Sequence, residues 1–149
     1  MTQPVTVRSA TEEDVEPWLA LAKSVEPLFG PMPDIAGPIQ RSISRGTALV
    51  AEDRDGRLAG AALLSRDDQP HVIHWLAVRP DARRQGIGSA LMKAIITRWN
   101  GAPVEVVTFG ADVAGGEAAR ALYEAHGFEF LEHHEKGPEG GNRERWIRH

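Results

Sequence analysis

The spacing of apolar residues along the chain predicts short strands and amphipathic helices in a definite order. Alternating or continuous apolar runs predict strands at residues 4–9, 47–52, 58–65, 71–78, 104–109, 128–135 and 143–147. Helical spacing predicts a helix after the acidic cap at residues 11–14, and further helices at 38–45, 86–99 and 117–125. The order is β-α-α-β-β-β-α-β-α-β-β. An antiparallel meander joined to βαβ crossovers indicates a mixed α/β sheet with helices packed on its faces.

Residues 24–38 interrupt this pattern. Four prolines and two glycines fall there and exclude a long regular helix. Large apolar residues are interleaved with them: Leu28, Phe29, Met32 and Ile35. A proline-rich segment with such side chains is typical of a semi-rigid lid or pocket wall, although the same residues can also serve only to cover the core.

Length and composition place the chain among ordinary globular proteins. It has 149 residues, of which 42% are apolar and 26% charged, and we expect one domain spanning residues 1–149. No apolar run approaches the roughly 18 residues of a membrane-spanning helix, and residues 1–10 lack the pattern of a secretory signal. The sequence therefore predicts a cytoplasmic protein without a membrane partner.

Composition and spacing also exclude several kinds of chemistry. Cysteine is absent, which excludes a disulfide framework, a thiolate zinc site and a cysteine nucleophile. The formal net charge of −4 argues against sequence-independent binding of nucleic acid, because that needs a basic surface. His71 and His74 are spaced so that they point to opposite faces of a predicted strand, and we assign no metal site.

One segment is basic in spite of the acidic total. A strand ending at Val78 leads through Pro80 into a helix that begins near Gly86 and Gly88. Glycines at a helix start leave backbone N–H groups free to converge on an anion, aided by the positive end of the helix dipole. The segment is typical of a cradle for phosphate or pyrophosphate, although it matches neither the Walker loop nor the dinucleotide fingerprint. Its charged residues are Arg79, Arg83, Arg84, Lys93 and Arg98, with Asp81 as the acidic exception.

Two stretches of the sequence carry motifs. The first follows a strand ending Leu76-Ala77-Val78 and reads Arg83-Arg84-Gln85-Gly86-Ile87-Gly88. The second spans residues 118–128 and contains Ala119, Leu122, Tyr123, Gly127 and Phe128. They resemble the GNAT acetyltransferase family, whose coenzyme A motif is Gln/Arg-x-x-Gly-x-Gly/Ala and whose later block is Ala-x-x-Leu-Tyr-x-x-x-Gly-Phe. The order of elements fits the family over nearly the whole chain, with residues 1–70 supported by pattern alone.

The resemblance implies a fold and a co-substrate. The implied fold is a mixed α/β structure with a mostly antiparallel, twisted sheet of about six or seven strands. It has helices on both faces and a splayed central pair of parallel strands, and acetyl-CoA enters the opening between these two strands. The implied cofactor-binding residues are Leu76, Ala77 and Val78 on the strand, followed by Arg83, Arg84, Gln85, Gly86, Ile87, Gly88 and Ser89 at the helix start.

The resemblance also assigns catalytic roles in acetyl transfer to an amine. Tyr123 falls at the family's general-acid position and would protonate the departing thiolate, with simple core packing as the alternative. Direct attack in a ternary complex is the simplest route, because no cysteine can carry the acetyl group. His74 is a candidate base, because it lies four residues before Val78 and, by period two, on the same strand face. Carboxylates acting through water compete for this role: Glu26, Asp34 and Glu52.

One position departs from the family pattern. Many members carry asparagine seven residues before the tyrosine, where it contacts coenzyme A, and this chain has Gly116. A cofactor contact is therefore lost there or replaced by backbone.

The acceptor amine stays open at this point. The resemblance places the first two helices and their connection over the acceptor site, with walls from Trp18, Glu26, Leu28, Phe29 and Met32. Both a small-molecule amine and a peptide amine are compatible with the sequence as acceptors. The sequence is also compatible with a homodimer. Two other functions remain: an acyl-CoA-binding sensor without turnover, and a protein that binds a nucleotide phosphate at the same helix start.

Overall fold

The computed structural model describes residues 5–68, 70–82 and 85–149, and its elements follow the predicted order with one additional short helix. The strands are β1 (Thr6–Ser9), β2 (Ala48–Glu52), β3 (Leu58–Leu64), β4 (Val72–Val78), β5 (Val104–Phe109), β6 (Phe128–His134) and β7 (Arg143–Arg148). The helices are α1 (Val15–Ser24), α2 (Glu26–Phe29), α3 (Ala36–Arg45), α4 (Ile87–Arg98) and α5 (Glu117–Ala125), with 3-10 turns η1 (Glu12–Asp14) and η2 (Pro80–Ala82). Within the described ranges, no helix is long and apolar enough to cross a membrane.

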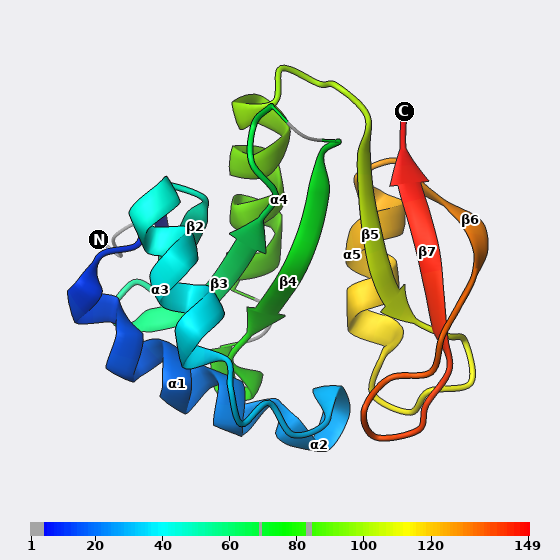
Figure 1. Ribbon diagram of the computed structural model, residues 1–149, viewed down its shortest axis with the longest axis horizontal. Helices are drawn as coiled ribbons and strands as arrows, with labels where there is room; N and C mark the ends of the chain where they lie inside the picture. Colours follow the sequence, from blue (N-terminus) through cyan, green and yellow to red (C-terminus); the bar gives the residue numbers. More distant parts are fainter. Residues whose placement is uncertain (1–4, 69, 83–84) are drawn as a thin grey trace.

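The strands form one twisted sheet with helices on both of its faces (Figure 1). Among the described residues it has seven strands, in the order β1-β2-β3-β4-β5-β7-β6. Neighbouring strands are antiparallel except for β4 and β5, which run parallel. The predicted mixed and mostly antiparallel sheet is confirmed, with its parallel pair near the centre.

Two apolar layers hold the helices against the sheet. On one face α1 and α3 bury Trp18 and Ile39 completely, and on the other face α4 buries Leu91. Because successive strand residues point to opposite faces, Val50 and Ala51 belong to different layers. The continuous apolar run of β2 is therefore buried on both faces of the sheet.

The strands β4 and β5 separate soon after they begin. They pair at Val72 with Glu105 and at Ile73 with Val106, and beyond this point they diverge (Figure 1). The outer edge of β4 stays paired with β3, and the outer edge of β5 stays paired with β7. The predicted splayed pair is confirmed, and each of its strands is held by its outer neighbour.

The proline-rich segment bridges the two diverging strands. The helix α2 ends at Gly30, whose φ of +88° lies in the left-handed region that glycine adopts without strain. A Cβ added there would lie 2.9 Å from the Pro138 Cβ, so the segment touches the loop between β6 and β7. Phe29 packs against both Trp75 of β4 and Phe109 of β5. One aromatic side chain thus spans the gap in the sheet.

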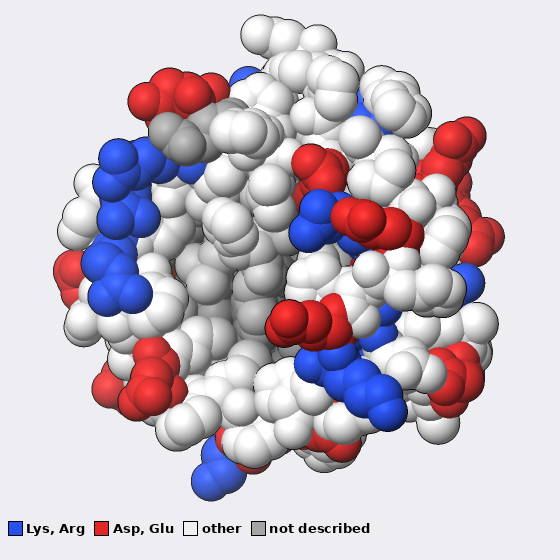
Figure 2. All heavy atoms as spheres, turned by 45° about the vertical axis from the view of Figure 1, so that its right-hand side comes forward, with Lys and Arg blue, Asp and Glu red and all other residues white. Residues whose placement is uncertain are grey.

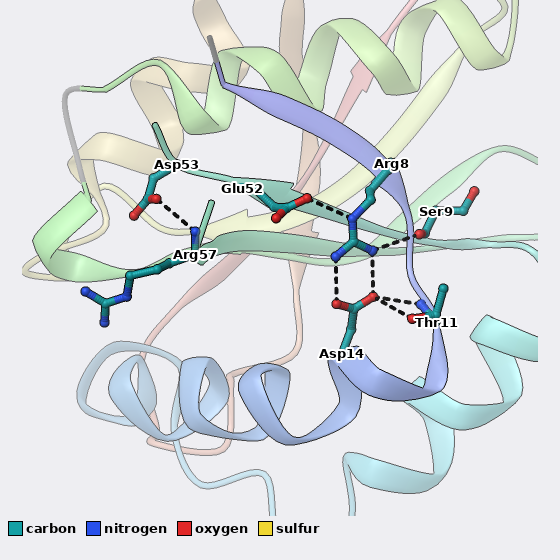
Figure 3. A network of polar contacts seen from close by, with 7 residues as sticks. All are labelled: Arg8, Ser9, Thr11, Asp14, Glu52, Asp53 and Arg57. Atoms are coloured by element: carbon teal, nitrogen blue, oxygen red, sulfur yellow. Dashed lines mark hydrogen bonds and ion pairs between the residues drawn. The ribbon is translucent and has the colours of Figure 1, made fainter. Parts of the chain in front are cut away.

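An ion-pair network joins the first two strands to the start of α1 (Figure 3). Arg8 of β1 donates to both carboxylate oxygens of Asp14, at 2.8 and 2.9 Å, and to Glu52 of β2 at 2.9 Å. The Asp14 carboxylate also accepts the backbone N–H of Thr11 at 2.7 Å, which satisfies a donor at the helix start. The hydrogen bonds from Arg8 hold the pKa of Asp14 below its ordinary value.

Replacing Asp14 tests this network. A carboxylate whose pKa is lowered on folding contributes stability above its ordinary pKa of 3.8, and that stability is lost as the pH falls through the lowered value. We expect Asp14→Asn to lower the free energy of unfolding at pH 7 by about 2 kcal/mol. The deficit relative to the wild type should shrink below about pH 4, as measured by urea unfolding. Glu13→Gln, an exposed neighbour in the same turn, is the matched control, and an equal loss in both variants contradicts the assignment.

Candidate active site

Hydrogen bonds along β4 show which of its backbone groups face the gap. The N–H of Arg79 donates to the C=O of Ala59 in β3 at 2.7 Å. Because backbone groups alternate in direction along a strand, those of Ala77 also face β3, and those of Leu76 and Val78 face the gap. Leu76 and Val78 therefore present N–H and C=O groups to a ligand that enters between β4 and β5.

A β-bulge at His74 interrupts the alternation along β4. Ile73 and Trp75 lie opposite consecutive residues of β3, so His74 is an extra residue without its own counterpart. Ile73 and Leu76 consequently pack in the same core layer. The period-two argument that placed His74 on the face of Leu76 does not hold across the bulge, because one extra residue reverses the alternation.

The larger of two cavities at the gap, here called the first cavity, has a volume of about 450 Å³. It lies between β4 and the starts of α4 and α5, and its lining is largely apolar. Most of the predicted cofactor-binding residues line it: Leu76, Ala77, Val78, Gly86, Ile87, Gly88 and Ser89. Gln85 is outside the lining, and the predictions for Arg83 and Arg84 lie outside the described residues. The rest of the lining is Leu28, Phe29, Ala82, Phe109, Gly115, Ala118, Ala119 and Leu122.

The helix α4 begins at this cavity without a side-chain cap. Its N-cap residue, Gly86, has a φ of +79° and makes no side-chain hydrogen bond. A Cβ on Gly88 would lie 3.1 Å from the Leu122 side chain, so the glycine allows α4 and α5 to approach closely. N–H groups at a helix N-terminus carry partial positive charge and bind anions. This end of the first cavity therefore suits a ligand that carries phosphate.

Two basic residues of the same segment are engaged in ion pairs. Arg79 contacts Asp53 at 3.0 Å and also contacts Asp81, and Arg98 contacts Asp67 at 3.0 Å. Their charges are matched within the fold. Arg98 ends α4, so only Arg79 lies near the helix start, and the charges that these two residues add to residues 79–98 are balanced by their partners.

The second cavity, of about 300 Å³, contains both predicted catalytic residues, His74 and Tyr123. The two cavities share four lining residues: Phe29, Leu76, Phe109 and Ala119. The remaining lining consists of Met32, Ile73, His74, Trp75, Val106, Val107, Thr108, Tyr123, Pro138 and Arg143. On the face drawn in Figure 2, the hollow near the centre is walled by uncharged residues, and charged side chains stay at its rim. In the part of the chain that the structure describes, no group of three or more histidines and carboxylates could hold a metal ion.

Tyr123 is almost completely buried on α5. It is 4% exposed, and its ring meets Phe128 edge-on at 5.3 Å. Burial raises its pKa, because a phenolate loses its solvation in an apolar surrounding. The phenol therefore stays protonated at neutral pH and can donate to a ligand in the second cavity.

Aromatic side chains form a continuous wall beside the second cavity. Trp75 packs between Trp18 and Phe29, at ring-centroid distances of 5.9 and 5.7 Å, and Phe29 meets Phe109 edge-on at 5.3 Å. The indole N–H of Trp75 also donates to the Met32 sulfur at 3.2 Å. The wall thus joins α2, β4 and β5 across the gap, and Trp18 of α1 packs behind it.

The predicted acceptor-site residues occupy different positions. Phe29 and Met32 line the second cavity, and Leu28 lines the first. Trp18 is completely buried behind the aromatic wall, which it supports without lining a cavity. Glu26 is exposed and lines neither cavity. The structure therefore brings together the apolar members of the predicted set and leaves the carboxylate outside.

Sequence reasoning missed Thr108, Phe109 and Arg143 as members of the site. Phe109 lies against Gly116, where an added Cβ would lie 2.6 Å from the Phe109 Cβ. Phe109 fills the space that a larger residue at position 116 needs. The glycine in place of the family's asparagine thus reflects a large neighbour from another element.

Adding one methyl group at Gly116 tests this packing. Its backbone has a φ of −84° and a ψ of −6°, which alanine adopts without strain, so any loss comes from the contact with Phe109. We expect Gly116→Ala to lower the free energy of unfolding by about 1–3 kcal/mol. In a Phe109→Ala background the same change should cost clearly less, which a double-mutant cycle measures by urea unfolding. An equal cost in both backgrounds contradicts the contact as the cause.

Comparisons with known proteins agree with this geometry. The family model of the acetyltransferase (GNAT) domain matches residues 44–130. A mycothiol acetyltransferase from Clavibacter sepedonicus is 34% identical over an alignment of 102 residues that covers 63% of this chain and 33% of that protein. The chain spans about one third or less of the length of the curated relatives that it matches.

Solved structures with low sequence identity share the fold. The ribosomal-protein-S18-alanine N-acetyltransferase from Escherichia coli has a TM-score of 0.75 at 19% identity, over 97% of this chain and 92% of that chain. The PaiA N-acetyltransferase from Thermoplasma acidophilum, solved in complex with coenzyme A, has a TM-score of 0.73 at 14% identity, over 98% and 99%. Since the family model covers more than half of its residues, this chain belongs to the GNAT acetyltransferase family.

Proposed function

We propose that this protein transfers an acetyl group from acetyl-CoA to a primary amine by direct attack in a ternary complex. The observation that carries the proposal is the junction of the two cavities between β4 and β5. One cavity ends at an uncapped helix start, and the other holds a buried phenol and an imidazole. Phe29, Leu76, Phe109 and Ala119 line both, so ligands in the two cavities meet there.

In this proposal the first cavity holds the co-substrate. The start of α4 binds the pyrophosphate through backbone N–H groups near Gly86–Ser89, and the backbone of Leu76 and Val78 pairs with the pantetheine arm. Acetyl-CoA supplies an activated thioester carbonyl. A strand N–H that faces the gap polarises this carbonyl as charge develops on its oxygen, and the direction of the backbone groups favours Val78 over Ala77.

In this proposal, residues that line the second cavity carry out the proton transfers. The amine nitrogen attacks the carbonyl carbon, the carbon–sulfur bond breaks, and Tyr123 gives its proton to the departing thiolate. His74 accepts the proton that the amine loses. The competing carboxylates Glu26, Asp34 and Glu52 line neither cavity, which supports His74 over them. The chain has no cysteine, so no enzyme thiol carries the acetyl group between the two substrates.

Tyr123→Phe tests the general acid. Removal of the hydroxyl takes away the proton donor but keeps the ring that packs on Phe128. We expect kcat to fall about 100-fold or more, with the KM for acetyl-CoA and the melting temperature nearly unchanged. Release of coenzyme A thiol over a panel of amines measures the rate. An unchanged kcat contradicts the role, and binding of acetyl-CoA without thiol release from any amine indicates a sensor without turnover.

His74→Gln tests the base. A general base acts only in its unprotonated form, so its loss removes the acid limb of the pH profile. We expect kcat/KM at pH 7 to fall about 100-fold and the acid limb to disappear. His133→Gln, at an exposed position of β6, is the matched control. A retained acid limb and unchanged kcat/KM show that His74 is not the base.

A further inference from the structure

We propose that the acceptor is a small primary amine with an apolar or aromatic body, and that the Thr108 hydroxyl accepts a hydrogen bond from its amino group. This inference rests on the proposed acetyl transfer and concerns the second cavity. Four features of that cavity support it: a rigid aromatic wall, a balance of charge, an apolar lining, and a buried hydroxyl without a partner.

The wall is held in place by contacts outside the cavity. Trp75 is fixed from behind by Trp18, and its indole N–H is used by the Met32 sulfur. Phe109 lies between the Phe29 ring and the guanidinium of Arg143, which sits 4.5 Å from the centre of its ring. Side chains fixed in this way present an apolar surface that does not have to be ordered when a ligand binds.

The cavity offers no free negative charge to a polycation. Among its described lining residues there is no aspartate or glutamate. Its one arginine, Arg143, is 9% exposed and is paired with Glu139, and it also donates to the backbone C=O groups of Gly141 and Asn142. A polyamine would therefore bring a second ammonium into a place without a counter-charge, which is unfavourable. A volume of about 300 Å³ also lies at the small end of ligand sites.

The apolar lining also favours the reactive form of the acceptor. An ammonium loses solvation in such a cavity, so burial lowers the pKa of a bound amine. The amine that attacks must be uncharged, and an apolar cavity stabilises that form relative to the ammonium. The apolar surroundings that disfavour a polycation therefore favour the uncharged, reactive form of a ligand with a single amine on an apolar body.

Thr108 adds a specific polar contact. It lies on β5 in the open part of the gap, lines the second cavity with Tyr123, and is 3% exposed. Its hydroxyl has no hydrogen-bond partner among the described residues. A buried hydroxyl without a partner costs free energy, and an N–H of the bound amine would supply the partner.

The choice of acceptor tests the inference. Initial rates of thiol release from acetyl-CoA are compared for 2-phenylethylamine, spermidine and a lysine-containing peptide. We expect kcat/KM for 2-phenylethylamine to exceed the other two by about tenfold or more. Equal or higher values for spermidine or the peptide overturn the inference and leave the acetyltransferase proposal intact.

A binding measurement distinguishes failure of this inference from failure of the proposed acetyl transfer. Quenching of tryptophan fluorescence, with coenzyme A present, reports whether 2-phenylethylamine reaches the wall that contains Trp75. Binding without turnover of any amine overturns the proposed function and supports the assigned cavity chemistry. Absence of binding at millimolar amine overturns the inference itself.

Thr108→Val tests the hydroxyl with little change in shape. We expect the KM for 2-phenylethylamine to rise about fivefold, with the KM for acetyl-CoA unchanged, and Thr108→Ser to restore the wild-type value. Thr97→Val, at an exposed position of α4, is the matched control. An unchanged KM for the amine, or a lower melting temperature for Thr108→Val, assigns the hydroxyl a structural role and overturns this part of the inference.

Discussion

Two parallel strands that pair briefly and then part leave backbone N–H and C=O groups without strand partners on both facing edges. In this protein β4 and β5 stay paired through Ile73 and Val106 and then diverge. Buried backbone groups need hydrogen-bond partners, so the gap requires either water or an extended ligand. The site exists because the sheet is incomplete at this point, and both cavities open along the same unpaired edges.

The gap persists because each strand is held from outside. β3 and β7 continue to pair with β4 and β5, and the two helical layers pack on either face of the sheet. Gly60 of β3 shows how tight this support is, since a Cβ there would lie 2.8 Å from the Ile87 side chain. Across the opening, Phe29 packs against one residue from each strand, which fixes the distance between the two halves without closing the ladder.

The sequence predicts what depends on local pattern and misses what depends on contacts between distant elements. Alternation and helical spacing place the strands and helices, and Gly86 with Gly88 marks the helix start that lines the first cavity. The bulge at His74 was not predictable, because an extra residue in a strand leaves the composition of that strand unchanged. Nor could the sequence show that Phe109 fills the space beside Gly116, or that Trp18 lies behind Trp75 while Glu26 stays outside. Each of these depends on which side chains from other elements arrive at the same point.

Low polarity at the junction of the cavities acts on both proton transfers in the proposed reaction. Burial raises the pKa of Tyr123, so the phenol keeps its proton until the departing thiolate forms beside it, and the same apolar surroundings destabilise the charged thiolate and raise its affinity for that proton. The same surroundings destabilise an ammonium, so an amine bound there loses its proton more readily. Both effects need a cavity whose charged groups are already matched, as Arg143 is by Glu139. The acidic total of the chain therefore says little about this site, because the polarity of the lining, rather than the net charge, sets the protonation of donor and acceptor.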